Sequence, residues 1–327
     1  MADEGGTRVA IVVRTKDRPA MLRRALSSIL AQTLTQWETV IVNDGGDPRA
    51  VADVLAEVAD LADGRVRVLD HPESLGRWPA ANAGIAATSA PYLVLHDDDD
   101  RWHPEFLAET AAHLDAHPED NGVIVHAEVI HERYEADDLV ETYRYELEDH
   151  NPEVLLTDLL EFNRFVPIQF LYRRTLHDVL GEYDATKPAA ADWMFNLRAV
   201  ALRPIPYSSA RVLAYWHQRP GVNGVLGNSV FAAPVEHRVA DRRHRDEELR
   251  AFINEHGAGL PLFLTSAFAS RTREIQDAAD RRAQELHERI DRLDDALAGL
   301  QRSLELTIDA RIRRWVRTNR QRLRRKR

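Results

Sequence analysis

The sequence predicts an α/β fold: a doubly wound, mostly parallel sheet with helices on both faces, followed by a C-terminal helical coiled-coil extension. Over the first hundred residues, short β-branched segments alternate with segments whose apolar residues recur at helical spacing. The connections between the β-branched segments are too long for hairpins, which favours parallel pairing with helical crossovers. Near the C-terminus, leucine and isoleucine recur at heptad spacing, which is typical of a coiled coil.

The first predicted strand is the apolar run "RVAIVV" at residues 8–13, and a predicted helix follows at 19–33. Pro19 suits the first turn of that helix, where a backbone N–H would have no partner. Leu22 and Leu26 begin its apolar face. The pattern continues with predicted strands at 38–42, 65–70 and 92–96 and predicted helices at 48–62 and 79–88.

Beyond residue 100 the elements become less regular. The sequence predicts helices at 105–116, 153–163 and 190–202, strands at 122–134 and 210–218, a strand leading into a helix at 165–176, and a loop at 219–235. Apolar and polar residues alternate in 122–134, so we expect this strand to be more exposed and to pair antiparallel. The loop is expected because glycine, asparagine and proline are frequent there.

We expect three parts: an α/β domain at 1–235, a helical connection at 236–270, and a coiled-coil helix with a basic C-terminal tail at 271–327. The heptad positions are Leu286, Ile290, Leu293, Leu297, Leu300 and Leu304. Their spacing predicts a homo-oligomer held by a parallel or antiparallel coiled coil. A helix that packs back on its own α/β domain is the alternative.

The net charge of −10 is unevenly distributed: residues 271–327 carry +7 and the remainder carries −17. An acidic body is not typical of a protein that binds nucleic acid, so we expect no nucleic-acid partner. Residues 311–327 hold ten basic side chains and no acidic one. This favours peripheral contact with anionic lipid headgroups, with Trp315 entering the interface; a solvated tail is the alternative.

The sequence also restricts the compartment. It contains no cysteine, so disulfides, thiolate metal sites and cysteine nucleophiles are excluded. Its start, "MADEGGTRVA", lacks the apolar segment of a signal peptide, and no run of about 18 apolar residues is present. We therefore expect a cytoplasmic protein, with the inner membrane face as the place of any peripheral contact.

Polar clusters follow three of the predicted strands: "RTKDR" after the first, "NDGGD" after the second and "HDDDD" after the fourth. In a doubly wound sheet, ligands gather beyond the carboxyl ends of the strands. The four consecutive aspartates of "YLVLHDDDDRWHP", Asp97 to Asp100, therefore predict a site for Mg²⁺ or Mn²⁺ that shares the ion with substrate phosphates. A solvated acidic loop that caps the next helix is the alternative.

Residues 8–218 resemble the inverting family 2 glycosyltransferases. The resemblance is carried by "VAIVVRTKDRPAMLRRALSSILAQTLTQWETVIVNDGG", "AANAGIA", "YLVLHDDDDRWHPEFL", "YRRTLHDVLGEYD" and "ADWMFNLR". It implies the GT-A fold, a Rossmann-like sheet with helices on both faces. It also implies a nucleotide-diphospho-sugar donor and a glycan or lipid-linked acceptor.

The resemblance assigns donor and metal roles to residues at the strand ends. Asp99 is expected to contact the metal that bridges the donor diphosphate. Asp97 and Asp98 are expected near the ribose and the water shell of the metal, with Asp97 also a metal ligand. Asp44, in "VNDGG", matches the residue that hydrogen-bonds the base of the donor. Thr15 and Arg18 are expected to line the nucleotide pocket.

Further roles come from the second half of the resemblance. Asp192, in "ADWMFNLR", falls where the family keeps its catalytic base. Asn82 is expected to bind the nucleotide sugar, and His217 to complete the metal site; a surface histidine is the alternative for His217. The sequence departs from the family pattern at three positions: Arg14 stands where proline is common, Ala81 where arginine is common, and Ala191 where glutamate is common.

Together these features predict a metal-dependent inverting glycosyltransferase of the hexosyltransferase type, active in cell-surface polysaccharide or glycolipid biosynthesis. A carboxylate can take the proton of an acceptor hydroxyl while the nucleoside diphosphate leaves. Two alternatives are a catalytically inactive glycosyltransferase-like scaffold and a sugar nucleotidyltransferase. The loop "RTKDRP" has no glycine, which argues against the nucleotidyltransferase, and no P-loop occurs.

Overall fold

The computed structural model describes residues 6–135, 138–147, 151–187, 189–222, 224–228 and 234–324. Contacts within the chain divide it into two compact units, Met1–Arg245 and Asp246–Arg327. The first unit contains the sheet with its helices, and the second is helical.

Most of the sheet is parallel. Its described strands are β1 (Val9–Thr15), β2 (Trp37–Asp44), β3 (Val66–His71), β4 (Tyr92–Asp97), β5 (Arg101–Trp102), β6 (Gly122–Glu135), β7 (Asp138–Glu146), β8 (Glu153–Val154), β9 (Phe170–Arg173) and β10 (Ile205–Gln218). The order is β3-β2-β1-β4-β9-β6-β10-β5, with β7 paired to β6 and β8 to β10. The pairs β1–β2, β2–β3, β1–β4 and β6–β10 are parallel, which confirms the predicted fold class.

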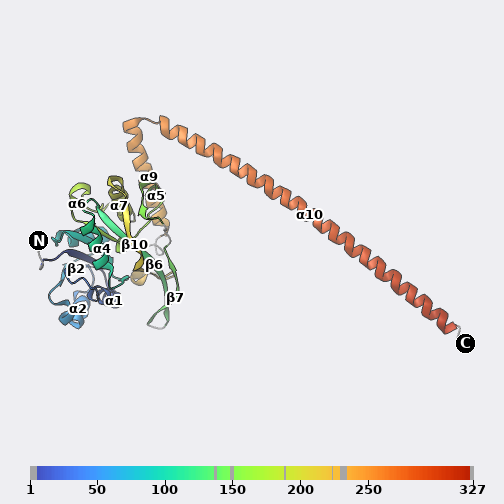
Figure 1. Ribbon diagram of the computed structural model, residues 1–327, viewed down its shortest axis with the longest axis horizontal. Coiled ribbons are helices and arrows are strands. Elements are labelled where there is room, and N and C mark those ends of the chain that lie inside the picture. Colours follow the sequence, from blue (N-terminus) through green and yellow to red (C-terminus); the bar gives the residue numbers. More distant parts are fainter. Residues whose placement is uncertain are drawn as a thin grey trace. The chain divides into compact units, whose positions relative to one another are not determined.

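Helices cover both faces of this sheet, as Figure 1 shows for α1 and α2 on one side and α6 and α7 on the other. Their bounds are α1 (Pro19–Leu30), α2 (Pro48–Ala62), α3 (Arg77–Ala86), α4 (Phe106–Ala116), α5 (Leu156–Glu161), α6 (Thr175–Leu180) and α7 (Ala191–Leu202). Alternate residues of β1 enter different cores: Val9 and Ile11 join the core with α1, α2 and α4, and Ala10 and Val12 join the core with α3 and α7. All four are fully buried, so the apolar run at 8–13 is explained by helices on both faces.

The parallel pairing brings the predicted polar clusters to one edge. β1 lies between β2 and β4, and all three strands run in the same direction. Arg14 is therefore in register with Asp97, and Thr15 with Asn43. Asp97 ends β4, and Asp98 to Asp100 connect it to the short strand β5, which pairs antiparallel with β10. This edge is where the predicted site lies.

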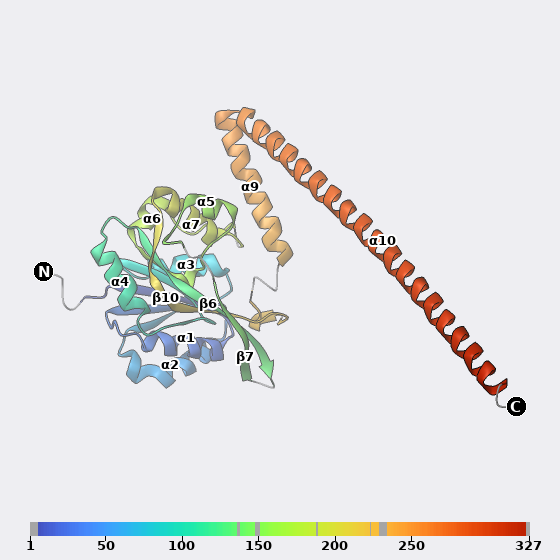
Figure 2. The same cartoon turned by 45° about the vertical axis from the view of Figure 1, so that its right-hand side comes forward.

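Several elements differ from the sequence-based prediction, among them β7, which that prediction lacks, and β10, which begins before the expected residue 210. The helix expected at 153–163 is shorter, because β8 precedes it and α5 spans only Leu156–Glu161. The N–H of Leu155 donates to Asp158 Oδ2 over 2.9 Å, which fixes the helix start. The strand at 122–134 does pair antiparallel with β7 and β9, but it is parallel to β10; Figure 2 shows β6 and β7 side by side.

Helices follow the sheet. α9 spans Pro234–His256, and α10 spans Gly259–Arg324 as one helix of 66 residues. The long C-terminal helix is thus confirmed, although it begins before the expected start at 271 and the three-part division remains a prediction. The short helix η2 (Gly224–Leu226) lies in the expected loop, of which 223 and 229–233 are outside the described residues. Among the described helices, none is long and apolar enough to cross a membrane.

Candidate active site at the carboxyl ends of the strands

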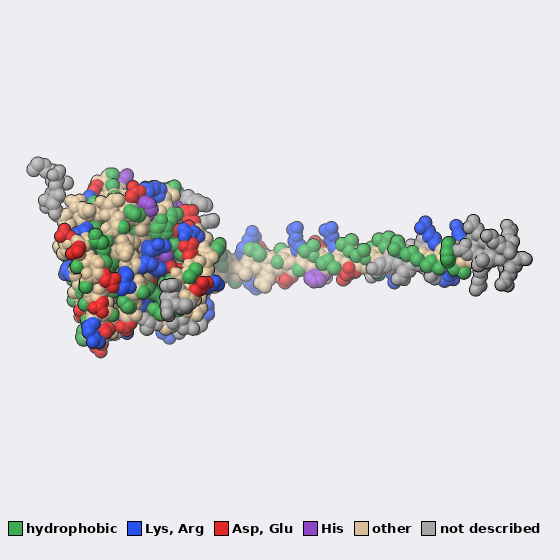
Figure 3. Space-filling model, turned by 90° about the horizontal axis from the view of Figure 1, so that it is seen from below, with side chains coloured by type: hydrophobic (Ala, Val, Ile, Leu, Met, Phe, Trp, Pro, Cys, Tyr) green, Lys and Arg blue, Asp and Glu red, His purple; other side chains and the backbone are tan. Residues whose placement is uncertain are grey.

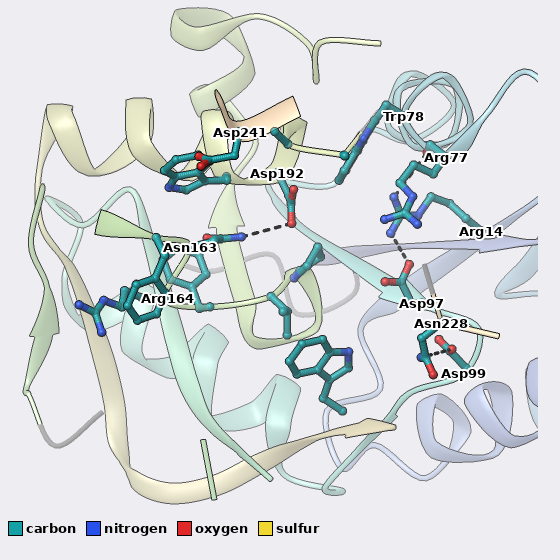
Figure 4. A pocket seen from close by; sticks show the side chains of 18 of the residues that line it. Arg14, Arg77, Trp78, Asp97, Asp99, Asn163, Arg164, Asp192, Asn228 and Asp241 are labelled. Carbon is teal, nitrogen blue, oxygen red and sulfur yellow. Dashed lines mark hydrogen bonds and ion pairs between the residues drawn. The ribbon is translucent and has the colours of Figure 1, made fainter. Parts of the chain in front are cut away.

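A cavity of about 1050 Å³ opens beyond the carboxyl ends of β1 and β4. Figure 4 shows residues from distant segments that point into it. Arg14 comes from β1, Arg77 from the start of α3, Asp97 from the end of β4, Asn163 from the loop after α5, and Asp192 from the first turn of α7. The first part of α9 completes the wall.

Asp98 lies beneath the cavity and does not line it. Its side chain is fully buried, and Oδ2 accepts hydrogen bonds from Thr15 Oγ1 at 2.7 Å and Arg18 Nε at 3.1 Å. Burial raises the pKa of Asp98 to about 7, although the charge of Arg18 opposes this shift. Of these three predicted donor ligands, Arg18 is the one that reaches the cavity. Thr15 and Asp98 fix the loop that carries the other aspartates.

Asp97 lines the cavity and is paired with Arg14, whose guanidinium donates to Asp97 Oδ1. Burial alone would raise the pKa of Asp97, but the charges of Arg14 and Arg77 lower it below its usual value. Arg14 also lies over the ring of Trp78, 5.1 Å from its centroid, which fixes its direction. The residue that replaces the family's proline is therefore part of the site.

Asp99 also lines the cavity, and its Oδ2 accepts hydrogen bonds from buried side chains. Arg219, whose side chain is fully buried, donates to this oxygen, and so does Asn228 Nδ2 at 3.1 Å. Arg18 lies 3.6 Å from the same atom. The carboxylate is thus oriented by residues that follow β10.

The two cavity-lining aspartates fit a hard divalent cation. Asp97 Oδ2 and Asp99 Oδ1 accept no hydrogen bond from any residue that the structure describes, while the other oxygen of each carboxylate is fixed. Both residues lie at the cavity surface, and carboxylate oxygens are the ligands that Mg²⁺ and Mn²⁺ prefer. Two protein ligands leave most of the coordination sphere to water and substrate phosphates.

His217 is engaged elsewhere. Its side chain is buried, Nδ1 lies 2.7 Å from Glu132 Oε1, and Nε2 accepts a hydrogen bond from Arg101 Nε at 2.9 Å. Its backbone N–H donates to Asp100 Oδ1 at 2.8 Å. Both ring nitrogens therefore have protein partners, and this geometry gives no support to the predicted role of His217 as a metal ligand.

Asp192 lies across the cavity from Asp97 and Asp99 (Figure 4). Asn163 Nδ2 donates to its Oδ2 at 3.3 Å, and Asn196 Nδ2 donates in turn to Asn163 Oδ1 at 3.2 Å. Burial raises the pKa of Asp192 above its usual value, against the opposing charges of Arg77 and Arg14. A fixed carboxylate of raised pKa suits a general base.

Two predicted donor ligands lie outside this cavity. Asp44 accepts hydrogen bonds from the backbone N–H groups of Leu75 and Gly76, both at 2.9 Å, and from Ser74. Burial alone would raise the pKa of Asp44, but the hydrogen bond between its Oδ1 and His71 Nδ1 at 2.9 Å, together with the three bonds above, lowers that pKa below its usual value. Asn82 pairs with both backbone groups of Tyr183, at 2.9 and 3.1 Å, and so holds α3 against the segment before α7. In this geometry both residues stabilise loops.

The sequence profile of the family described as "Glycosyl transferase family 2" matches residues 10–181, more than half of the chain. The chain belongs to this family. The matched range covers β1 through α6 and includes Asp97 to Asp100, while Asp192 lies beyond it.

Two relatives cover much of this glycosyltransferase. The "Uncharacterized glycosyltransferase YwdF" of Bacillus subtilis is 31% identical over 195 residues, which are 59% of this chain and 68% of the relative. The "PGL/p-HBAD biosynthesis glycosyltransferase" of Mycobacterium bovis is 28% identical over 211 residues, 64% of this chain and 73% of the relative. The "Succinoglycan biosynthesis protein ExoW" of Rhizobium meliloti is 34% identical over 91 residues, 27% of this chain and 28% of the relative.

A solved structure shares the fold of this glycosyltransferase. It is the mannosyltransferase PcManGT from Pyrobaculum calidifontis in complex with GDP-Man and Mn²⁺, with a TM-score of 0.52 and 16% identity. The alignment covers 76% of this chain and 65% of that one. At this identity the likeness shows the fold, and it agrees with the GT-A expectation.

The structure adds site residues that the sequence-based prediction lacks. Asn163 positions Asp192, and Arg219 and Asn228 position Asp99. All three lie in loops between periodic segments, where hydrophobic periodicity gives no signal. The "RP" after "AYWHQ" and the clustered asparagines at 223 and 228 were the available signals.

Proposed function

We propose that this family 2 glycosyltransferase transfers a sugar from a nucleotide-diphospho-sugar to an acceptor hydroxyl, with divalent metal and with inversion. The observation that carries the proposal is that one cavity holds Asp192 opposite Asp97 and Asp99. A general base and a diphosphate site on opposite sides of one cavity suit a single displacement at the anomeric carbon.

The donor diphosphate belongs at the end of the cavity lined by Arg14, Lys16, Arg18 and Arg77. These side chains supply cationic donors for phosphate oxygens. Asp97 and Asp99 would hold the metal, each with one carboxylate oxygen that no described residue uses. When bound, the metal neutralises negative charge that develops on the leaving diphosphate.

The acceptor belongs at the opposite end, where Phe162, Arg164 and Trp193 line the cavity. The Asp192 carboxylate takes the proton of the acceptor hydroxyl as the new bond from oxygen to the anomeric carbon forms. The bond from that carbon to the diphosphate oxygen breaks at the same time, and the electron pair leaves with the nucleoside diphosphate. The indole N–H of Trp193 donates to Leu159 O at 2.7 Å, which fixes the wall beside the base.

The names of two relatives, which refer to succinoglycan and PGL/p-HBAD biosynthesis, support a proposal for the pathway in which this enzyme works. We place the enzyme in cell-surface polysaccharide or glycolipid synthesis, working in the cytoplasm or at the inner membrane face. Exposed Ile312, Trp315 and Val316 near the basic end of α10 support peripheral contact with anionic lipid. Sedimentation with vesicles of phosphatidylglycerol, compared with phosphatidylcholine alone, tests this contact; a Trp315→Ala variant should bind the anionic vesicles more weakly.

A thermal-shift screen of nucleoside diphosphates and their sugars, with and without Mn²⁺, tests the function. Binding to the folded state raises the melting temperature. We expect one nucleotide class to give a Mn²⁺-dependent shift that Asp99→Ala abolishes and Asp63→Ala, a surface control, retains. No shift with any nucleotide would support an inactive scaffold. Release of pyrophosphate from a nucleoside triphosphate and a sugar phosphate would support a nucleotidyltransferase.

A further inference from the structure

A continuous apolar seam runs along α10. It consists of Leu286, Ile290, Leu293, Leu297, Leu300 and Leu304, whose spacing is four, three, four, three and four residues. Every one of these side chains is more than half exposed. Figure 3 shows hydrophobic side chains gathered along this helix with charged side chains beside them. Such a seam on a long helix is energetically unfavourable in water unless another surface covers it.

The seam has the geometry of a coiled coil. Ile290, Leu297 and Leu304 occupy the a positions of consecutive heptads, and Leu286, Leu293 and Leu300 occupy the d positions. A strict 3.5-residue period keeps the seam facing a partner helix that has the same period. A second copy of α10 has the same 3.5-residue period over the whole length of the seam, so it is a matching partner helix. Leucine at every d position, with isoleucine at one a position, favours two strands.

The charges beside the seam distinguish the two orientations. Arg289 occupies a g position and Asp294 the e position five residues later. In a parallel pair these positions face each other across the interface, so Arg289 of each copy meets Asp294 of the other, which gives two attractive pairs. In an antiparallel pair centred on the seam, Asp294 meets the same residue of the other copy, and like charges repel. The flanking charges therefore favour the parallel orientation.

We propose that residues 283–304 of two copies of this chain form a parallel, in-register, two-stranded coiled coil. The interface is independent of the catalytic proposal, since it uses no residue of the cavity. It joins the C-terminal helices of two enzymes and so places two catalytic units on one dimer.

Disulfide cross-linking of the full chain tests the orientation, because the protein contains no native cysteine. In the parallel dimer, Leu286→Cys faces its own copy and should form a covalent dimer under mild oxidation. In an antiparallel dimer the two Leu286→Cys thiols would lie roughly 27 Å apart. There, cross-linking would require a mixture of Leu286→Cys and Leu304→Cys chains. Asp291→Cys, on the outer face, is the control and should not cross-link.

Sedimentation equilibrium tests the number of strands. We expect a mass of twice the 37.2 kDa of one chain, which Leu297→Asp reduces to the monomer while Ala298→Asp, one position outside the seam, does not. Asp294→Arg should weaken the dimer at low salt, and the double variant with Arg289→Asp should restore it. A monomer at tens of micromolar, a trimer, or cross-linking only in the mixed sample would each overturn the proposal.

Discussion

Asn163 Nδ2 donates to a carboxylate oxygen of Asp192 over 3.3 Å, across the gap between the loop after α5 and the first turn of α7. Asn196, one turn further along α7, fixes Asn163 from the other side. This chain of two amides holds the proposed base in one orientation and stabilises its ionised form. Asn163 is therefore a positioning residue whose effect should appear in the pH profile.

Asn163→Ala should lower kcat and move the acid limb of kcat/KM to higher pH. The base works when ionised, so activity falls as the pH drops through the pKa of Asp192, which burial already raises. Loss of a hydrogen bond to the carboxylate raises that pKa further. The pH–rate profile measures the shift. Asn121→Ala, outside the cavity, is the control. An acid limb that does not move in Asn163→Ala would contradict the positioning role of Asn163.

Asp192→Asn should reduce kcat at least about 100-fold and leave donor binding nearly unchanged. It should also stabilise the fold near pH 7. Because burial raises the folded-state pKa of Asp192 above its unfolded-state value, the ionised carboxylate destabilises the fold at neutral pH. This penalty disappears as the pH falls below the unfolded-state pKa of about 3.9. Melting temperatures at several pH values check the sign, and a loss of stability in Asp192→Asn at pH 7 would contradict it.

Arg219→Met should destabilise the α/β unit by about 3–5 kcal/mol, because two buried carboxylates lose their partner. Arg219 donates to Asp99 Oδ2 and lies 3.3 Å from Glu132 Oε2. Burial works against ionisation of Glu132, but His217 and Arg24 lower its pKa to about 2, so it is charged at neutral pH. Urea denaturation measures the loss.

A second substitution separates charge from packing. Glu132→Gln added to Arg219→Met should restore part of the stability, since one of the unpaired charges is removed. Arg49→Met is the matched control, because the Arg49 side chain is 89% exposed and its pair with Asp47 is at the surface. An equal loss in Arg49→Met and Arg219→Met would contradict the buried-pair argument.

Arg14→Met should weaken donor binding about tenfold or more, because a charged hydrogen-bond donor to the diphosphate is lost. In the absence of nucleotide, Arg14→Met should strengthen the binding of Mn²⁺, because the guanidinium of Arg14 competes with the ion for the Asp97 carboxylate. Calorimetric titrations measure both affinities. Arg23→Met is the control, because Arg23 of α1 forms an exposed ion pair with Glu57 of α2. Parallel loss of both affinities would indicate that Arg14 only holds the loop.

Strong local patterns made much of the fold predictable. The run predicted at 8–13 is apolar from residue 9 onward because β1 is buried on both faces, and α2 begins and ends at the predicted residues 48 and 62. Parallel strand order then brought Asp97 and the aspartates that follow it to the edge shared with Arg14 and Arg18. Roles taken from resemblance alone remain predictions, because tertiary contacts that no local pattern reveals decide them. The ring of His217 and the amide of Asn82 are occupied by protein partners far away in sequence.

The most direct test of the account is ¹H NMR of donor consumption by the wild-type enzyme and by Asp192→Asn, with the nucleotide sugar identified by thermal shift. We predict Mn²⁺-dependent consumption by the wild type, with a product whose anomeric configuration is opposite to that in the donor. Asp192→Asn should bind the same donor and consume almost none. Retention of configuration, or undiminished consumption by Asp192→Asn, would contradict a single displacement with Asp192 as the base.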